Sequence, residues 1–159
     1  MCDVPTRHPA QPTRIARRLC SRLTAATVAV LAGGLSTAYA AEVVVRVEGV
    51  TPSQTRVYVS LCTGGLEPDD CGNAQVVGAD SPTLQVRFAN VPPGVYAVAA
   101  FQDLNGDGTL DRSPRGLPRE PYGFSREAGR KTSPRFDRAA FTVERDVSVE
   151  VRLALPGRP

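Results

Sequence analysis

The residues best suited to chemistry lie in the segment DLNGDGTLD, from residue 103 to residue 111. Oxygen ligands at alternate positions of a short loop can turn toward one Ca²⁺ ion. Gly108 stands where such a loop turns sharply, and the main-chain carbonyl of the following residue adds a further ligand. The spacing therefore predicts calcium ligands at loop positions 1, 3, 5, 7 and 9, which are Asp103, Asn105, Asp107, the Thr109 carbonyl and Asp111.

The segment departs from an EF-hand in two respects. Position 12 is Pro114, which cannot supply a bidentate carboxylate, and no helical pattern flanks the loop. Glu120, Asp137 or water would have to complete the ligand set. The alternative is a plain turn made by Asn-Gly and Asp-Gly, with Arg112 or Arg115 as counter-ions for carboxylates that otherwise repel one another.

A basic segment follows the acidic loop. Prolines and glycines interrupt it and favour an irregular conformation. Aromatic residues lie among the charges, a pattern that suits an anionic polymer or glycan, with Arg115, Arg119, Tyr122 and Phe124 as candidate ligand-binding residues. Alternatively, the aromatic rings hold the segment against the domain and the cations face solvent. The eight basic residues are Arg112, Arg115, Arg119, Arg126, Arg130, Lys131, Arg135 and Arg138.

Familiar catalytic sets lack their parts in this chain. Its single histidine is His8 and its single lysine is Lys131, so a histidine-based triad, imidazole-bound zinc and a Ser-Lys dyad are not expected after residue 40. The sequence favours a non-catalytic binding or structural module. A carbohydrate-active hydrolase that uses a carboxylate pair, for instance Asp107 and Glu120, is the alternative.

Residues 1–40 have the organisation of a signal peptide. A basic region with four arginines precedes a short apolar run over 23–35, and Ala38-Tyr39-Ala40 fits a small-x-small cleavage site. The apolar run is too short to span a membrane. We therefore expect a mature chain that begins at Ala41 and is periplasmic or secreted.

Removal of residues 1–40 changes the charge of the protein. Five of the 19 basic residues and one of the 16 acidic residues lie there, which leaves 14 basic and 15 acidic residues. The basic character of the whole chain thus belongs to the export signal, and nucleic acid is not an expected partner. The expected partners are a glycan or other anionic envelope ligand, or a protein.

Two cysteines, Cys62 and Cys71, remain after residue 40. In an oxidising compartment this pair predicts a disulfide that closes a short loop. A metal site with two thiolates and no histidine is the weaker alternative.

Alternating apolar residues predict short strands, and no segment has the pattern of an amphipathic helix. The run over 96–101 is apolar throughout, which indicates a strand covered on both faces in the middle of a sheet. The pattern predicts an all-β, antiparallel β-sandwich that forms a single domain over residues 41–159. The expected strands cover 42–49, 57–61, 75–77, 84–88, 96–101, 141–143 and 147–155.

The sequence also resembles a family of exported bacterial proteins of unknown function, DUF2141. Four motifs carry the resemblance in order: FANVPPGVYAVAAFQDLNGDGTLD, GLPREPYGFS, FDRAAFTV and the alternating last strand. The resemblance covers about Val43 to Leu153 and implies a prealbumin-like or immunoglobulin-like sandwich. It implies no activity.

Overall fold

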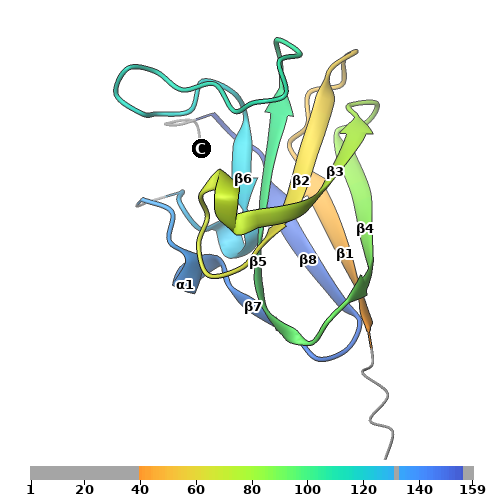
Figure 1. The fold of residues 1–159 in the computed structure, drawn as a ribbon. Helices are drawn as coiled ribbons and strands as arrows, with labels where there is room; N and C mark the ends of the chain where they lie inside the picture. Colours follow the sequence, from red (N-terminus) through yellow and green to blue (C-terminus); the bar gives the residue numbers. More distant parts are fainter. Residues whose placement is uncertain (1–39, 131–132, 156–159) are drawn as a thin grey trace, which may run out of the picture. The chain divides into compact units, whose positions relative to one another are not determined.

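In the computed structural model of the protein, residues 40–130 and 133–155 are described (Figure 1). They form two β-sheets, with three short helical turns between strands. The expected signal peptide lies outside the described residues except for Ala40. Both sheets contribute apolar side chains to one core, which confirms the all-β sandwich.

The first sheet has the strand order β4-β1-β8. β1 and β4 are antiparallel, whereas β1 and β8 run parallel, a detail that the expectation of an antiparallel sandwich did not include. A parallel pair is compatible with the sequence because the same alternation of side chains fits either direction. The bounds are Ala41–Glu48 for β1, Thr83–Val91 for β4 and Val147–Arg152 for β8.

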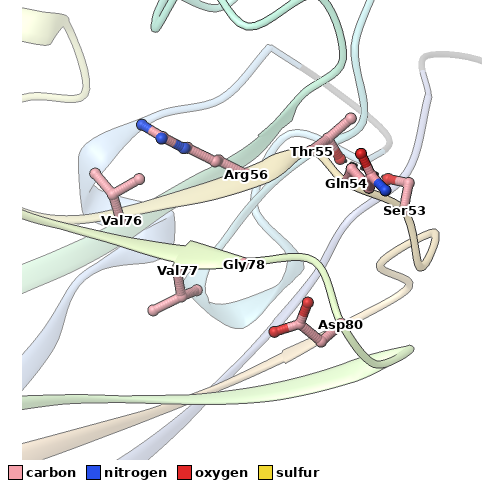
Figure 2. A pocket seen from close by; sticks show the side chains of 8 residues that line it. All are labelled: Ser53, Gln54, Thr55, Arg56, Val76, Val77, Gly78 and Asp80. Atoms are coloured by element: carbon pink, nitrogen blue, oxygen red, sulfur yellow. Dashed lines mark hydrogen bonds between the residues drawn. The ribbon is translucent and has the colours of Figure 1, made fainter.

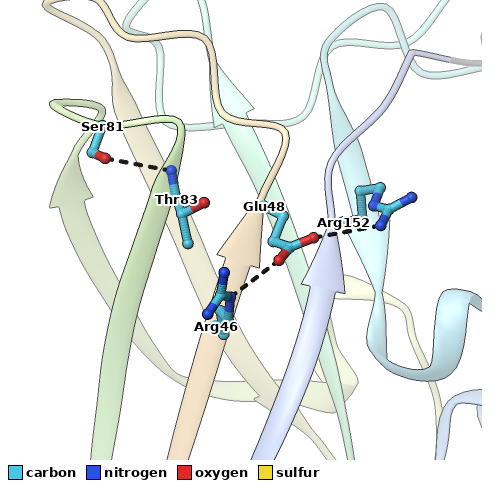
Figure 3. A network of polar contacts seen from close by, with 5 residues as sticks. All are labelled: Arg46, Glu48, Ser81, Thr83 and Arg152. Carbon is cyan, nitrogen blue, oxygen red and sulfur yellow. Dashed lines mark hydrogen bonds and ion pairs between the residues drawn. The ribbon is translucent and has the colours of Figure 1, made fainter.

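Alternation along β1 separates the two faces of this sheet. Val43, Val45 and Val47 are buried, while the intervening side chains face solvent. On the solvent face, Glu48 accepts from Arg46 at 3.0 Å and from Arg152 at 3.5 Å (Figure 3). These exposed ion pairs contribute little to stability, so the buried valines hold the sheet in place.

The second sheet has the order β3-β2-β5-β6, and β7 also pairs with β5. β5 lies in the middle, as its apolar sequence predicts. β3 begins at Cys71, four residues before the expected strand 75–77. The bounds are Arg56–Cys62 for β2, Cys71–Gly78 for β3, Gly94–Asp103 for β5, Tyr122–Phe124 for β6 and Phe141–Val143 for β7.

The described part of the basic segment, residues 112–130 and 133–138, is more ordered than its prolines and glycines predict. It contains β6, a 3-10 turn η2 over Ser125–Glu127 and one turn of α-helix, α1, over Phe136–Ala139. β6 can form because Gly123 faces the main chain of Arg152 so closely that an added Cβ would lie 2.3 Å from its carbonyl oxygen. The expectation that this segment is wholly irregular is therefore corrected.

A second, smaller apolar cluster explains where this segment packs. Phe124, Ala128 and Ala139 are buried with Ala97 of β5 and Cys62 of β2. Cys62 and Cys71 form the expected disulfide, and the chain between them includes the 3-10 turn η1 over Pro68–Asp70. The second sheet has one face toward the main core, and this cluster covers part of its opposite face.

The two sheets are joined along one side. Tyr122 of β6 and Ala154, just after β8, exchange both main-chain hydrogen bonds at 3.1 and 3.0 Å. This pairing leaves β3 and β4 at the ends of their sheets. Within the described part of the chain, every helix is too short to cross a membrane.

Candidate functional site

The acidic loop follows directly from the central strand. β5 ends at Asp103, a buried residue whose Oδ1 accepts from the Gly106 N–H at 2.7 Å and whose Oδ2 accepts from the Gly108 N–H at 2.9 Å. Both glycines have φ near +80° (81° and 79°), a conformation that L side chains rarely adopt. Asp103 therefore fixes the start of the loop by binding two of its main-chain amides.

Three other side chains of the loop meet at one point. The Asn105 Nδ2 lies 2.9 Å from Asp107 Oδ2 and 3.3 Å from Asp111 Oδ2. The Asp107 Oδ1 accepts from the main-chain N–H and the hydroxyl of Thr109, both at 2.8 Å. These two hydrogen bonds have the largest effect on the pKa of Asp107, and the hydrogen bond from Asn105 has a smaller one. All three hold that pKa below its ordinary value. Asp107 is thus an exposed, ionised carboxylate that points toward Asn105 and lies near Asp111.

Glu120, an expected source of a further ligand, has a different role in this structure. It is buried, its Oε1 accepts from the Leu104 N–H at 2.6 Å, and its Oε2 accepts from the Asp111 N–H at 3.0 Å. One carboxylate thereby holds both ends of the loop. Asp137, the other expected source, lies on α1 and forms two hydrogen bonds with Arg135 at 3.0 Å.

The chain after the loop folds back on itself as a short hairpin. The Ser113 N–H donates to the Leu117 carbonyl and the Arg119 N–H to the Asp111 carbonyl, both at 2.8 Å. Arg112, one expected counter-ion, donates instead to the Gly116 carbonyl at 3.2 Å. The hydrogen bonds to the loop carboxylates come from main-chain amides, the Thr109 hydroxyl and the Asn105 amide.

The four candidate ligand-binding residues separate into two groups. Arg115 and Arg119 are exposed on the hairpin, and within the described part of the chain their side chains have no hydrogen-bonding or ionic partner. Tyr122 and Phe124 lie on β6, where their rings pack edge to face with centroids 5.9 Å apart in the second apolar cluster. The aromatic residues therefore anchor the segment, and the arginines face outward.

Sequence reasoning missed the role of Gln102, which is buried beside Asp103. Its Oε1 accepts from the Thr51 N–H at 2.9 Å, and its Nε2 donates to the Thr51 carbonyl at 2.7 Å and the Thr55 hydroxyl at 2.8 Å. A polar amide within an apolar strand is the signal that points to such a role. Gln102 holds the chain between β1 and β2 at the same end of β5 as the acidic loop.

That chain also borders a shallow groove of about 440 Å³ (Figure 2). The groove has polar and charged groups on its rim and two valines beside them. No side chain that was expected to bind a ligand lines it. Its residues are Ser53, Gln54, Thr55, Arg56, Val76, Val77, Gly78 and Asp80.

Ser125 is another buried polar residue, and unlike Gln102 it has no sequence signal. Its hydroxyl accepts from the Val98 N–H at 2.9 Å and donates to the Ala139 carbonyl at 2.7 Å. It thus joins β5 to the end of α1 beneath the second cluster. We assign it a structural role because both of its hydrogen bonds are with main-chain atoms.

The acidic loop suits a hard cation by the chemistry of its donors, which are carboxylate, amide and carbonyl oxygens. Within residues 40–130 and 133–155, no three Asp, Glu, His or Cys side chains are grouped as a metal site. The convergent set instead consists of Asp107, Asp111 and the amide of Asn105. A cation here would need the Asn105 amide to turn its oxygen toward the two carboxylates.

Together these features define an all-β module with a polar loop at the end of its central strand. The chain belongs to the bacterial family DUF2141, described as an uncharacterized protein conserved in bacteria, whose family model matches residues 45–150. Comparison with curated proteins and with solved structures gives no significant match.

Proposed function

We propose that this protein is an exported, non-catalytic binding module of the cell envelope and that its loop 103–111 binds Ca²⁺. One observation carries the proposal: a carboxylate oxygen of Asp107 and one of Asp111 both lie within 3.3 Å of the side-chain nitrogen of Asn105. A divalent cation in that place would relieve the repulsion between the two carboxylates more strongly than a neutral amide. The ion would add a link between the exposed side chains of a loop whose main chain is held by Asp103 and Glu120.

The ligands would be Asp103, Asn105, Asp107, the Thr109 carbonyl and Asp111. Asp103 would use a lone pair that its two main-chain hydrogen bonds leave free, because each carboxylate oxygen can accept more than one contact. Position 12 of the loop supplies no carboxylate, so we expect weak binding, with a Kd of about 10⁻⁴ to 10⁻³ M, as in extracellular modules. Such an affinity suits an exported protein rather than a cytosolic sensor.

Thermal unfolding tests the calcium proposal. At ten times the Kd, calcium should add about 1.4 kcal/mol to the free energy of unfolding, which raises the Tm by a few degrees. Asp111→Asn should abolish the shift, since its carboxylate is replaced by a neutral amide. It is a better variant than Asp103→Asn because Asp103 also binds the Gly106 and Gly108 amides.

The matched control is Asp69→Asn, which changes an exposed carboxylate on η1. It should retain the full calcium shift. Equal ionic strength is kept with sodium chloride in the presence of a chelator. An identical Tm in 10 mM calcium and in chelator would overturn the calcium proposal and favour a plain turn.

We further propose that Arg115 and Arg119 contact an anionic glycan or another anionic envelope ligand. Both guanidinium groups are exposed without a partner in the described part of the chain, and they lie on one hairpin beside the acidic loop. Arg145 is a matched control, since it is also exposed without a described partner but lies in the turn between β7 and β8.

A glycan array that includes sulfated and carboxylated oligosaccharides tests this contact. Binding should weaken at least about tenfold when both hairpin arginines become alanine, and it should fall with added salt. Arg145→Ala should bind like the wild type. Equal losses in the double variant and in Arg145→Ala would contradict a specific contact at the hairpin.

The competing proposal is a carbohydrate-active hydrolase with Asp107 and Glu120 as its carboxylate pair. This proposal requires Glu120 to exchange a proton with the substrate, yet both of its oxygens accept main-chain N–H groups. The binding module therefore accounts for Glu120 better. Turnover of a glycan that is lost in Asp107→Asn would favour the hydrolase.

A further inference from the structure

The strand β3 is an unprotected edge of the second sheet. In the described part of the chain it pairs only with β2, and its sequence CGNAQVVG contains neither a charged residue nor proline. Edge strands usually carry such residues because they discourage pairing with another chain. By comparison, the edge strand β4 carries Arg87, and the far side of β6 is paired with Ala154. β3 is therefore the edge best suited to accept another strand.

The main chain of β3 offers hydrogen-bonding groups at this edge. The Ala79 N–H donates to the Thr55 carbonyl at 3.0 Å, a bond that flanks Arg56 and Gly78 and makes these two residues a non-hydrogen-bonded pair. Antiparallel pairs alternate, so Val77 is also bonded to β2 whereas Val76 and Gly78 are not. The N–H and carbonyl of Val76 thus point away from β2.

An apolar row on the outer face of the sheet ends at the same residue. Val76 pairs with Tyr58, Tyr58 with Phe101, and Phe101 with Tyr122, so their four side chains form one row across the sheet. The rings of Tyr58 and Phe101 stack with centroids 5.0 Å apart. Val76 is 45 % exposed, and Figure 2 shows it on the opposite side of the β3 ribbon from Val77. In the described part of the chain, no strand continues this row beyond Val76.

We propose that β3 pairs with β3 of a second copy of this chain, antiparallel about a two-fold axis at Val76. The two Val76 residues would exchange both of their outward main-chain hydrogen bonds, and the apolar rows of the two sheets would become continuous. Ala74 would face Gly78 of the partner, so small uncharged residues meet on either side of the axis.

The partner is more easily a second copy of β3 than a charged peptide. β3 carries no charged residue that could attract a peptide of opposite charge. Asn73 has a positive φ of 50°, and the register with β2 shifts nearby, so the regular edge is short. A short edge buries little area, and the dimer is accordingly weak. The proposal does not depend on the calcium or glycan proposals, since none of their residues lies on β3.

Sedimentation velocity over a series of protein concentrations tests the proposal with exported protein in which the disulfide is intact. The wild type should shift from monomer to dimer as the concentration rises toward the millimolar range. Val76→Lys should raise the dimer Kd at least about tenfold, because two like charges would then face each other across the axis. Val95→Lys is the matched control, since Val95 is 52 % exposed but lies where β5 pairs with β7, and it should dimerise like the wild type.

Val76→Pro provides a second test that adds no charge. It removes the outward N–H, and proline is tolerated at an edge position whose N–H is not bonded within the sheet. It should also weaken the dimer, while circular dichroism confirms the fold of each variant. A wild type that stays monomeric throughout, or a dimer equally stable in Val76→Lys and Val95→Lys, would overturn the proposal.

Discussion

Four carboxylates at the end of β5 have two different tasks. Asp103 and Glu120 are buried, and each of their oxygens accepts a main-chain N–H, so they hold the loop in its conformation. Asp107 and Asp111 approach the amide of Asn105 and retain access to solvent. The sequence placed all of the loop carboxylates in one pattern because residue spacing does not reveal which of them face the protein interior.

Because Glu120 holds both ends of the loop, we expect a conservative substitution of Glu120 to lower the stability of the protein. Glu120→Gln keeps the size of the side chain but replaces one acceptor oxygen with an NH₂ group, which would face the N–H of Leu104 or Asp111. A partly buried main-chain donor would lose its partner, and we expect the free energy of unfolding to fall by about 1–3 kcal/mol. Urea unfolding at neutral pH measures this difference.

Glu127→Gln is the control for that measurement. Glu127 is exposed, and its contact with Arg130 is a long ion pair of 3.9 Å. We expect the control to change stability by less than about 0.5 kcal/mol. Equal stabilities of Glu120→Gln and the wild type would show that the two hydrogen bonds to the loop are dispensable.

At the scale of elements, local patterns predicted the strands with strong alternation. β1, β2, β4 and β8 follow period-2 sequences, whereas β5 is apolar on both faces and lies in the middle of its sheet. The disulfide was also predictable, since only two cysteines follow residue 40. These features depend on neighbouring residues or on composition.

β6 and α1 were not predictable in the same way. β6 has only three residues, and it forms because β5 pairs with one side of it and Ala154 with the other. α1 is a single turn that packs with the second apolar cluster. Both elements are stabilised by partners that are distant in sequence. The hydrophobic periodicity of a short segment contains no information about such partners. The parallel direction of β8 against β1 has the same origin.

At the scale of the molecule, the proposed functions lie on separate parts of one sandwich. The acidic loop and the arginine hairpin follow the end of β5, whereas the unprotected edge belongs to β3 (Figure 1). The loop is attached through Asp103 and Glu120 rather than through the main core, so its side chains can be altered without disturbing the packed valines. This separation allows each proposal to be tested with its own variant.

The first described strand leads to a prediction for export. β1 begins at Ala41, which is buried and pairs with Val91, and the Glu42 N–H donates to Asp146 at 2.8 Å. Cleavage after Ala40 would therefore retain every described strand. We expect N-terminal sequencing and intact mass of protein from the periplasm or medium to give Ala41 as the first residue, with a Tm that does not require residues 1–40.

Two leucine substitutions, at Ala40 and at Tyr39, test whether cleavage occurs between Ala40 and Ala41. Signal cleavage needs a small side chain at the residue before the cut, so Ala40→Leu should leave precursor uncleaved at this position. Tyr39→Leu alters the adjacent position, where size matters little, and should be processed normally. Recovery of the full chain from Met1 outside the cytoplasm, or equal processing of both variants, would contradict cleavage between Ala40 and Ala41. Processed protein should then show the calcium-dependent Tm, because all of the proposed ligands lie after residue 102.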